Sequence, residues 1–438
     1  MGQPLQLRAY QDDAADFLYE RDRAMILAPV GAGKTAITLT AMQAMIDDGH
    51  VKRWLVVAPK RVCTDVWPVE APKWAPRLRL ALAVGAPAQR QAALVSSADA
   101  VVINYDNLDK LDTLDGFDGI VFDELTRLKN PGGKRFKALE KLLAGVKVRW
   151  GLTGSFTSNG LEDVFGQCKV IDQALLGRAK GAFLQQYFVC INRDFGQWTP
   201  AAGALEQVMA RIRPATFVLE PGEYKDKLPP CHVVEVRCAL ADRAPYDKMK
   251  REYVVRFGDE RVIAQNAASV TTKLQQMASG FVYNRESSAG AIWYSPHKFD
   301  RLEELLAENQ RANTIVFYTF QEELAKLRQR FSHLQTLDDD RAIERWNNGE
   351  IQLLAAHPKS AQFGLNLQFG GSMMVFLSLP WSLVDFEQAI GRLHRSGQKH
   401  DVWVYLLLTE NTIDERILKA LRDKRSISDL AMEELHDR

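Results

Sequence analysis

Short apolar runs alternate with helical stretches in two separate zones of this 438-residue chain. Several of these runs end in small or charged residues, which is typical of buried parallel strands whose carboxyl ends carry function. Strands that alternate with helices require right-handed crossovers, so the pattern predicts a doubly wound α/β sheet in each zone. The runs of the first zone are Met25–Val30, Trp54–Pro59, Ala100–Tyr105, Gly119–Glu124 and Val148–Gly154, and those of the second zone are Thr314–Phe320, Ile351–His357, Met373–Pro380 and Val402–Thr409.

The pattern changes between the two zones, over roughly residues 160–296. Long helical stretches with breaks at Pro221-Gly222 and Pro229-Pro230 replace the short apolar runs there. We therefore predict two α/β lobes separated by a mainly helical insertion. The predicted segments are an N-terminal lobe over 1–159, the insertion over 160–296, a C-terminal lobe over 297–411 and a helical tail over 412–438.

Charge and composition exclude several classes of protein. Lys and Arg number 56 against 55 Asp and Glu, so the chain is not a bulk-cationic nucleic-acid coat, although a neutral total can hide a local basic groove. No apolar run approaches the roughly 20 residues of a membrane span, and the start lacks a signal-peptide core. The five cysteines form no C-x-x-C pair, which argues against a zinc site or a disulfide framework. These features favour a cytoplasmic protein.

A glycine-rich segment, Ala28–Thr35, follows the first predicted strand and opens a predicted helix. Gly31, Ala32 and Gly33 allow backbone N–H groups to surround phosphate oxygens at the positive end of the helix dipole. Lys34 can then reach the β- and γ-phosphates, and the Thr35 hydroxyl can ligate Mg²⁺. The alternative is a glycine-rich turn with an incidental Lys-Thr pair, which the strand–loop–helix setting disfavours.

Two carboxylates end the strand predicted at 119–124. In ATPases with a phosphate loop, an Asp at the place of Asp123 holds Mg²⁺, and the adjacent Glu124 is suited to polarising the attacking water. Asp is also favoured as a helix N-cap after a strand, and this is the competing interpretation. The presence of Lys34 upstream favours catalysis.

Arg392 and Arg395 are spaced three residues apart in the segment 388–398, which predicts that they share one face of a helix. An arginine beside the γ-phosphate stabilises transition-state charge and accelerates phosphoryl transfer by about 10³–10⁵. A solvated basic face is the usual explanation of an isolated R-x-x-R. The position of this pair after the strands of the second zone favours a role at the nucleotide.

The order of these and further motifs resembles the superfamily-two helicases, and within them the Swi/Snf-type DNA translocases. The resemblance covers nearly the whole chain, from about Leu7 to Arg425. Single motifs are weakly specific, whereas the complete ordered set is strongly specific. Besides the three segments above, the set contains Leu7–Gln11, Val57–Lys60, Trp67, Lys73-Trp74, Asn104–Asp106, Leu125–Asn130, Leu152–Ser155, Ile315–Phe317, Gly364–Gln368 and Pro380–Ser382.

The resemblance implies two RecA-like lobes and assigns further residues to ATP and Mg²⁺. Gln11 is implied to read the adenine edge by paired hydrogen bonds, and Gly364 belongs to a motif of the nucleotide site. Gln388, Arg392 and Arg395 are implied to complete the ATP site across the cleft between the lobes.

The resemblance also assigns contacts with DNA. Lys60, Arg61 and the segment around Tyr105 lie where this family contacts the DNA backbone, and Thr153 is implied to couple nucleotide state to that contact. Phosphate contacts carry little sequence information, so we expect binding that is largely sequence-independent and sensitive to salt.

Three segments depart from the family pattern. Asp-Glu-Leu-Thr replaces Asp-Glu-Ala-His, so the histidine role is altered at Thr126, and Gly154-Ser155-Phe156 replaces an ending in Thr-Pro. The segment 219–223 reads Leu-Glu-Pro-Gly-Glu where a basic Arg-Arg pair is expected, which weakens one DNA contact. Leu125-Thr126 in the first lobe and His357–Ser360 in the second resemble shorter bacteriophage and prophage members, which places the expected activity in a bacterial or phage-infected cell.

We therefore expect an ATP hydrolase that moves along double-stranded DNA without recognising sequence, with ATP and Mg²⁺ as its cofactors. Two alternatives stay open: a helicase that separates DNA or RNA strands, and a nucleotide-gated DNA-binding scaffold with negligible turnover. A chain of this length has little room for targeting modules, so we expect a protein partner or a DNA structure such as a branch to supply specificity.

Overall fold

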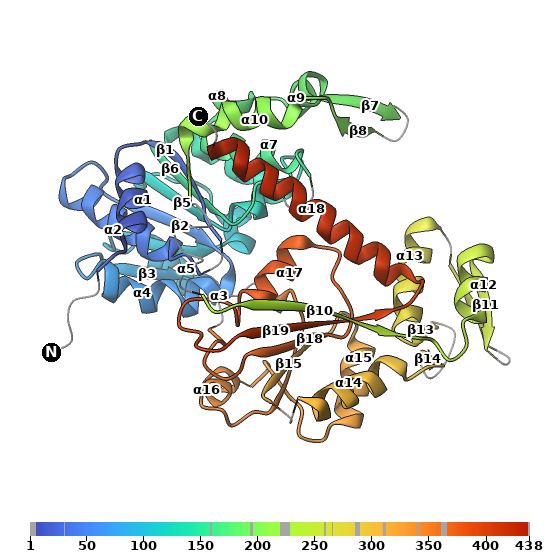
Figure 1. Ribbon diagram of the computed structural model, residues 1–438. Helices are drawn as coiled ribbons and strands as arrows, with labels where there is room; N and C mark the ends of the chain where they lie inside the picture. Colours follow the sequence, from blue (N-terminus) through green and yellow to red (C-terminus); the bar gives the residue numbers. More distant parts are fainter. Residues whose placement is uncertain are drawn as a thin grey trace. The chain divides into compact units, whose positions relative to one another are not determined.

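The computed structural model divides the chain into two compact units, residues 1–226 with 424–438 and residues 227–423 (Figure 1). The structure describes residues 6–29, 31–157, 160–192, 196–219, 228–257, 260–264, 266–284, 290–309, 312–339, 341–360 and 366–436.

Unit 1 is built on a seven-stranded parallel sheet with the strand order β3-β4-β2-β5-β6-β1-β9. Five of the strands match predicted apolar runs; each ends earlier than predicted, and β1 also begins two residues earlier, at Arg23. The strands are β1 (Arg23–Leu27), β2 (Trp54–Ala58), β3 (Leu80–Ala83), β4 (Ala100–Asn104), β5 (Gly119–Asp123), β6 (Val148–Thr153) and β9 (Thr216–Val218).

Helices cover both faces of this sheet, because alternate residues of each strand point to opposite sides. Ala24 and Ile26 pack in a core with α1, α2 and α4, whereas Met25 and Leu27 pack in a second core with α5, α6 and α7. The helices of the unit are α1 (Ala9–Tyr19), α2 (Lys34–Asp47), α3 (Lys60–Asp65), α4 (Trp67–Trp74), α5 (Pro87–Leu94), α6 (Lys134–Leu142), α7 (Asp163–Ile171), α8 (Gln173–Leu176), α9 (Lys180–Tyr187) and α10 (Ala204–Ile212), with the 3-10 turns η1 (Tyr105–Lys110), η2 (Leu125–Leu128), η3 (Leu143–Gly145) and η4 (Arg213–Ala215). The antiparallel pair β7 (Phe188–Asn192) and β8 (Gln197–Pro200) follows α9.

Unit 2 contains a six-stranded parallel sheet with the order β10-β19-β18-β15-β17-β16. Helices again pack on both faces, in two separate cores. The strands are β10 (Cys231–Cys238), β15 (Thr314–Phe317), β16 (Gln335–Thr336), β17 (Leu353–Ala356), β18 (Met373–Phe376) and β19 (Val402–Thr409), and the helices are α12 (Ala244–Glu252), α13 (Ala267–Ala278), α14 (His297–Glu308), α15 (Gln321–Arg330), α16 (Ala342–Asn347), α17 (Leu383–Ile390) and the start of α18 (Ile413–His436). Two antiparallel pairs complete the unit, β11 (Val254–Phe257) with β12 (Glu260–Ile263) and β13 (Phe281–Tyr283) with β14 (Ala291–Trp293).

The predicted fold class is confirmed in its architecture: each unit is built on a parallel α/β sheet with helices on both faces. The segment predicted as an insertion, 160–296, contains six of these helices but also gives one strand to each large sheet. β9 pairs with β1 and β10 pairs with β19, so the segment is shared between the units. The compact units therefore have other bounds than the four predicted segments.

No helix in the described part of the chain combines the length and the apolar character that crossing a membrane requires.

A buried ion pair joins the start of α18 to α14 within unit 2. Lys298 Nζ lies 2.7 Å from Asp414 Oδ2, and both side chains are at most 1% exposed. Lys298 also donates to the Leu377 carbonyl at 2.9 Å, and the Thr409 N–H donates to the same Asp414 carboxylate at 3.0 Å. These additional hydrogen bonds help to offset the cost of removing the two charges from water.

We expect Lys298→Met to lower the free energy of unfolding by about 3–5 kcal/mol, because it leaves the Asp414 carboxylate buried without its cation. The double variant Lys298→Met/Asp414→Asn should recover most of that loss, since the amide oxygen still accepts from the Thr409 N–H. Urea unfolding followed by circular dichroism measures both. A single variant as stable as the parent chain would contradict this account.

Candidate functional site

The predicted motifs of unit 1 follow the carboxyl ends of neighbouring strands. The phosphate loop follows β1, the third motif follows β6 and the acidic pair ends β5, and these three strands are adjacent in the sheet. The Ala28 N–H donates to the Thr153 carbonyl at 3.0 Å, so the loop continues the pairing of β1 with β6. Carboxyl ends of parallel strands form the usual ligand edge of such sheets.

The phosphate loop is a tight turn that leads into α2. Gly31 and Gly33 have φ angles of 88° and 86°, a left-handed conformation that glycine adopts without steric cost. Lys34 begins α2, and its Nζ donates to the carbonyls of Ala28 and Pro29 at 2.7 and 3.0 Å. The lysine thus curls over its own loop, and the start of the helix presents N–H groups suited to an anion.

Gln11 of α1 lies against the phosphate loop, as its assignment to the nucleotide requires. Its Nε2 donates to the Ala32 carbonyl at 3.1 Å, and its Oε1 accepts from the Arg8 N–H at 3.0 Å. Tyr10 donates to the same Ala32 carbonyl at 3.3 Å. A Cβ at Gly33 would lie 2.1 Å from Gln11 Nε2, so this glycine also makes room for the glutamine.

Opposing effects act on the pKa of Asp123. Desolvation raises the pKa of its carboxyl to about 6, and a hydrogen bond from Trp67 and the positive charge of Lys34 act in the opposite direction. Trp67 Nε1 donates to Asp123 Oδ2 at 3.0 Å. Because the charge of Lys34 lowers the pKa of Asp123, the loop lysine and this carboxylate interact electrostatically.

Glu124 adopts a left-handed conformation, with φ 66° and ψ 63°. A non-glycine residue in this region is strained and needs support from its surroundings. The support comes from Tyr105, whose hydroxyl donates to the carbonyls of Asp123 and Glu124 at 3.0 and 3.3 Å, and from Thr126, whose hydroxyl donates to Glu124 Oε1 at 2.5 Å. The threonine that replaces the family histidine therefore orients the glutamate.

The third motif has polar contacts within unit 1. Thr153 is fully buried and its hydroxyl donates to the Ser155 carbonyl at 2.8 Å. Ser155 Oγ lies 2.9 Å from Ser428 Oγ on α18, and both hydroxyls are buried. Phe156, the second departure from the family pattern here, is buried in the core.

The predicted DNA contacts fall into two groups. Lys60 and Arg61 open α3 directly after β2, and the Lys60 side chain is exposed. Tyr105 requires a correction: its side chain is only 2% exposed, so it is a support of the acidic turn and is not presented to solvent. Burial raises the pKa of its hydroxyl, which keeps the proton that it donates to the turn.

The predicted residues of unit 2 lie at and after α17. Gln388 and Arg392 are 5% and 4% exposed, and Arg395 is partly exposed. The prediction that the two arginines share a helical face is wrong, because α17 ends at Ile390 and both arginines occupy the turns that follow.

A glutamine side chain shapes these turns. Gln398 Nε2 donates to the carbonyls of Gln368 and Gly371, each at 3.0 Å. Gly364, also predicted for the nucleotide site, lies outside the described residues, as do Val30 of the phosphate loop and residues 220–223.

The donor set of unit 1 fits a magnesium ion. Mg²⁺ is usually held by one or two carboxylates together with substrate phosphates and water. Asp123 at the end of β5 and Thr35 in the first turn of α2 are residues with such oxygens. Among the described residues no group of three or more His, Cys, Asp or Glu could hold a metal ion by itself.

The sequence does not indicate the supporting roles of three site residues: Trp67, Tyr10 and Thr126. In the sequence, Trp67 is only one member of the family pattern, and Thr126 is only a departure from it. An aromatic residue downstream of a predicted strand carries no local signal that its indole will reach a carboxylate on another strand.

Two family models match this chain and together cover most of it. The model of the SNF2-related domain matches residues 10–278. The chain belongs to the SNF2-related family. The helicase conserved C-terminal domain matches residues 297–397, so the second unit carries the partner domain of helicase-like enzymes. The predicted family is confirmed, and with it the class of the protein, an ATP hydrolase of the helicase-like type that uses a nucleotide.

Relatives of this SNF2-related chain come from phages and from cellular organisms. "Putative protein p41" of Acyrthosiphon pisum secondary endosymbiont phage 1 is 35% identical over 97% of this chain and 98% of its own length. "Probable ATP-dependent DNA helicase CHR23" of Arabidopsis thaliana is 25% identical over 96% of this chain, which spans 43% of that protein. The solved SWI2/SNF2 ATPase core of Sulfolobus solfataricus in complex with dsDNA has 21% identity and a TM-score of 0.48, over 98% of this chain and 94% of that one.

We expect Gly33→Ala to weaken ATP binding and to reduce the preference for ATP over GTP, because the new Cβ displaces Gln11 Nε2. The left-handed backbone adds a stability cost of about 1–2 kcal/mol. Gly49→Ala is the matched control: its φ is 73°, but no atom lies within 4 Å of the position that a Cβ would occupy. Fluorescent-nucleotide titration and urea unfolding should show a similar stability loss in both variants and a nucleotide effect only in Gly33→Ala. Equal nucleotide affinities would rule out the contact with Gln11.

We expect Tyr105→Phe to lower turnover and to lower stability by about 1 kcal/mol, because the carbonyls of the acidic turn lose their donor. Its affinity for duplex DNA should not change. Tyr19→Phe, which removes an exposed hydrogen bond to Asp48, is the control and should leave both quantities nearly unchanged. A variant that loses DNA affinity with normal turnover would restore Tyr105 as a DNA contact.

Proposed function

We propose that this SNF2-related chain is an ATP-driven motor that translocates on double-stranded DNA. The observation that carries the proposal is the match of the SNF2-related domain and the helicase C-terminal domain to two parallel α/β units, the first of which gathers the phosphate loop and the acidic pair at one sheet edge. The relative CHR23 is named as a probable ATP-dependent DNA helicase, which supports DNA as the substrate.

In this proposal unit 1 binds and orients ATP. The N–H groups at the start of α2 hold phosphate oxygens, and Lys34 leaves its loop carbonyls to contact the β- and γ-phosphates. Asp123 and Thr35 would hold Mg²⁺, which would neutralise phosphate charge. Glu124, oriented by Thr126, accepts a proton from the attacking water.

Unit 2 supplies the remaining charges in the proposal. Arg392 and Arg395 stabilise the charge that develops on the γ-phosphate, and Gln388 helps to position them. The turns after α17 hold the arginines by backbone geometry rather than by a helix. The roles of these three residues rest on the family pattern.

DNA contact in the proposal begins with the exposed Lys60 and with Arg61 after β2. Contacts of this kind bind phosphate, so affinity should fall steeply with salt and should depend little on sequence. We further propose that a protein partner or a DNA branch directs the motor, and that it acts in the cytoplasm of a bacterial or phage-infected cell, in line with its phage relative.

We expect duplex DNA to stimulate phosphate release by the chain, and the chain to displace the third strand of a triplex with ATP. Lys34→Ala should reduce both activities by about a hundredfold or more, because it removes a positioned charge from the phosphates. Phosphate release is followed by a coupled colour assay and strand release by gel electrophoresis.

The control is Lys52→Ala, which removes an exposed lysine that precedes β2 at the opposite edge of the sheet. It should leave both activities intact. ATP binding without phosphate release would identify a scaffold, and unwinding of a plain duplex would identify a strand-separating helicase. Either result contradicts the proposal.

A further inference from the structure

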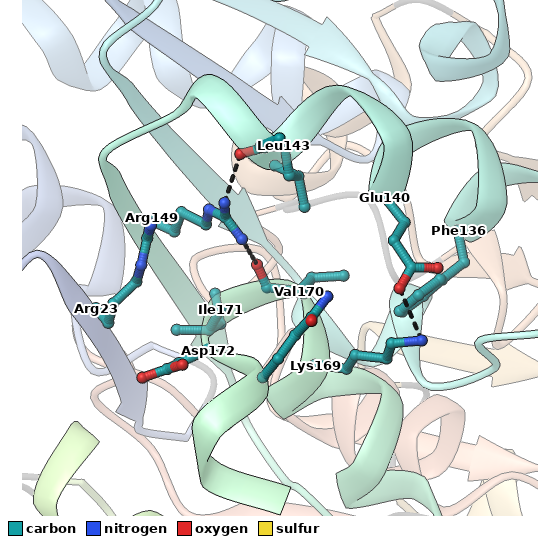
Figure 2. A pocket seen from close by; sticks show the side chains of 11 residues that line it. Arg23, Phe136, Glu140, Leu143, Arg149, Lys169, Val170, Ile171 and Asp172 are labelled. Atoms are coloured by element: carbon teal, nitrogen blue, oxygen red, sulfur yellow. Dashed lines mark hydrogen bonds and ion pairs between the residues drawn. The ribbon is translucent and has the colours of Figure 1, made fainter. Parts of the chain in front are cut away.

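A cavity of about 320 Å³ lies at the amino ends of β1 and β6, the opposite edge of the sheet from the phosphate loop (Figure 2). We call it the amino-edge cavity. Strands β1 and β6 line it with α6, η3 and the end of α7. Its volume exceeds the roughly 30 Å³ of a water molecule about tenfold and is in the range of small-ligand sites.

Two arginines stand side by side in the wall of the amino-edge cavity. Arg23 begins β1 and is the direct register partner of Arg149 on β6. Partners in a parallel ladder point to the same face, so the two guanidinium groups face the same core region. Both side chains are partly buried. Such a pair of like charges is unfavourable unless an anion balances it.

Arg149 is held rigidly by backbone carbonyls. Its Nε donates to Val146 at 3.3 Å, its Nη1 to Val170 at 3.4 Å and its Nη2 to Leu143. Figure 2 shows the guanidinium between the Leu143 and Val170 carbonyls. Carbonyls satisfy its hydrogen bonds but do not neutralise its charge.

Arg23 has an unused donor. Its Nη2 donates to the Val146 carbonyl at 3.2 Å, whereas its Nη1 is buried and has no hydrogen-bond acceptor among the described residues. A buried N–H of a charged group without an acceptor costs free energy, and a ligand that accepts this bond would recover it.

The two acidic side chains that line the amino-edge cavity form their ion pair or hydrogen bond with groups other than the two arginines. Glu140 pairs with Lys169 at 2.7 Å, and an Asp172 oxygen accepts from the Ala174 N–H at 2.8 Å. In the described part of the chain no carboxylate lies within ion-pair distance of Arg23 or Arg149. Burial lowers the pKa of both arginines, that of Arg149 to about 10, and Arg23 lowers the pKa of Arg149 further. The charge of Asp172 acts on both arginines in the opposite direction, so the two cations are only partly compensated.

We propose that the amino-edge cavity binds a small phosphate-bearing molecule through Arg23 and Arg149. A planar guanidinium matches the oxygens of a phosphate, and two neighbouring guanidinium groups suit a dianion. The ligand is free phosphate or a compact phosphate monoester, because the cavity is small. A duplex is disfavoured because a cavity of about 320 Å³ cannot enclose it.

Lys34→Ala serves as the background for the test, so that binding at the phosphate loop is weakened in every sample. Calorimetric titration with inorganic phosphate and with glucose 6-phosphate, at constant ionic strength, should give saturable binding. Adding Arg23→Gln should weaken it at least about tenfold, since a charge-assisted bond is lost. Lys137→Gln, an exposed lysine of α6 outside the cavity lining, is the matched control and should change nothing.

Ala144 provides a second pair of variants that does not touch the core. It is exposed and lines the cavity, so Ala144→Glu should weaken phosphate binding and Ala144→Lys should strengthen it. Tighter binding of glucose 6-phosphate than of phosphate identifies an ester site, and the reverse order identifies a phosphate site. The proposal is overturned if Arg23→Gln binds like its parent, if the two Ala144 variants bind alike, or if acetate or duplex DNA competes as well as phosphate.

Discussion

The parallel pairing of β5, β6 and β1 is the constraint on which the candidate ATP site depends. Asp123 is paired with Leu152, and Leu27 with Thr153, so three motifs that are far apart in the chain end at one sheet edge. The bond from the Ala28 N–H to the Thr153 carbonyl extends that pairing into the phosphate loop. A shift of one residue in this register would turn each side chain to the other face of the sheet.

Polar side chains fix the positions of the two carboxylates at this edge. Glu124 sits in a strained left-handed conformation, and it is held there by hydroxyls from Tyr105 and Thr126. Trp67 holds the Asp123 carboxylate while desolvation raises its pKa. The replacement of the family histidine by threonine is therefore compatible with an ordered acidic turn.

The two edges of the same sheet have different chemistry. Strand ends at the carboxyl edge leave backbone N–H groups, a lysine and carboxylates for a nucleotide and a metal. The amino edge places Arg23 beside Arg149 around a cavity whose acids are paired with other groups. In our proposals one parallel sheet carries a catalytic site at one edge and an anion site at the other, because both edges collect side chains from several strands.

The sequence alone predicts the fold class, the family, the phosphate loop with Lys34 and the strand that ends at Asp123, because apolar periodicity and short ordered motifs are local signals. It did not reveal β3, β9, β10 or β16, since such short or partly exposed strands exist only through partners distant in the chain. Tertiary structure also decided that α17 stops before Arg392 and that Tyr105 is buried as a support. Which side chains meet depends on sheet register and on core packing, and neither is encoded in the spacing of a motif.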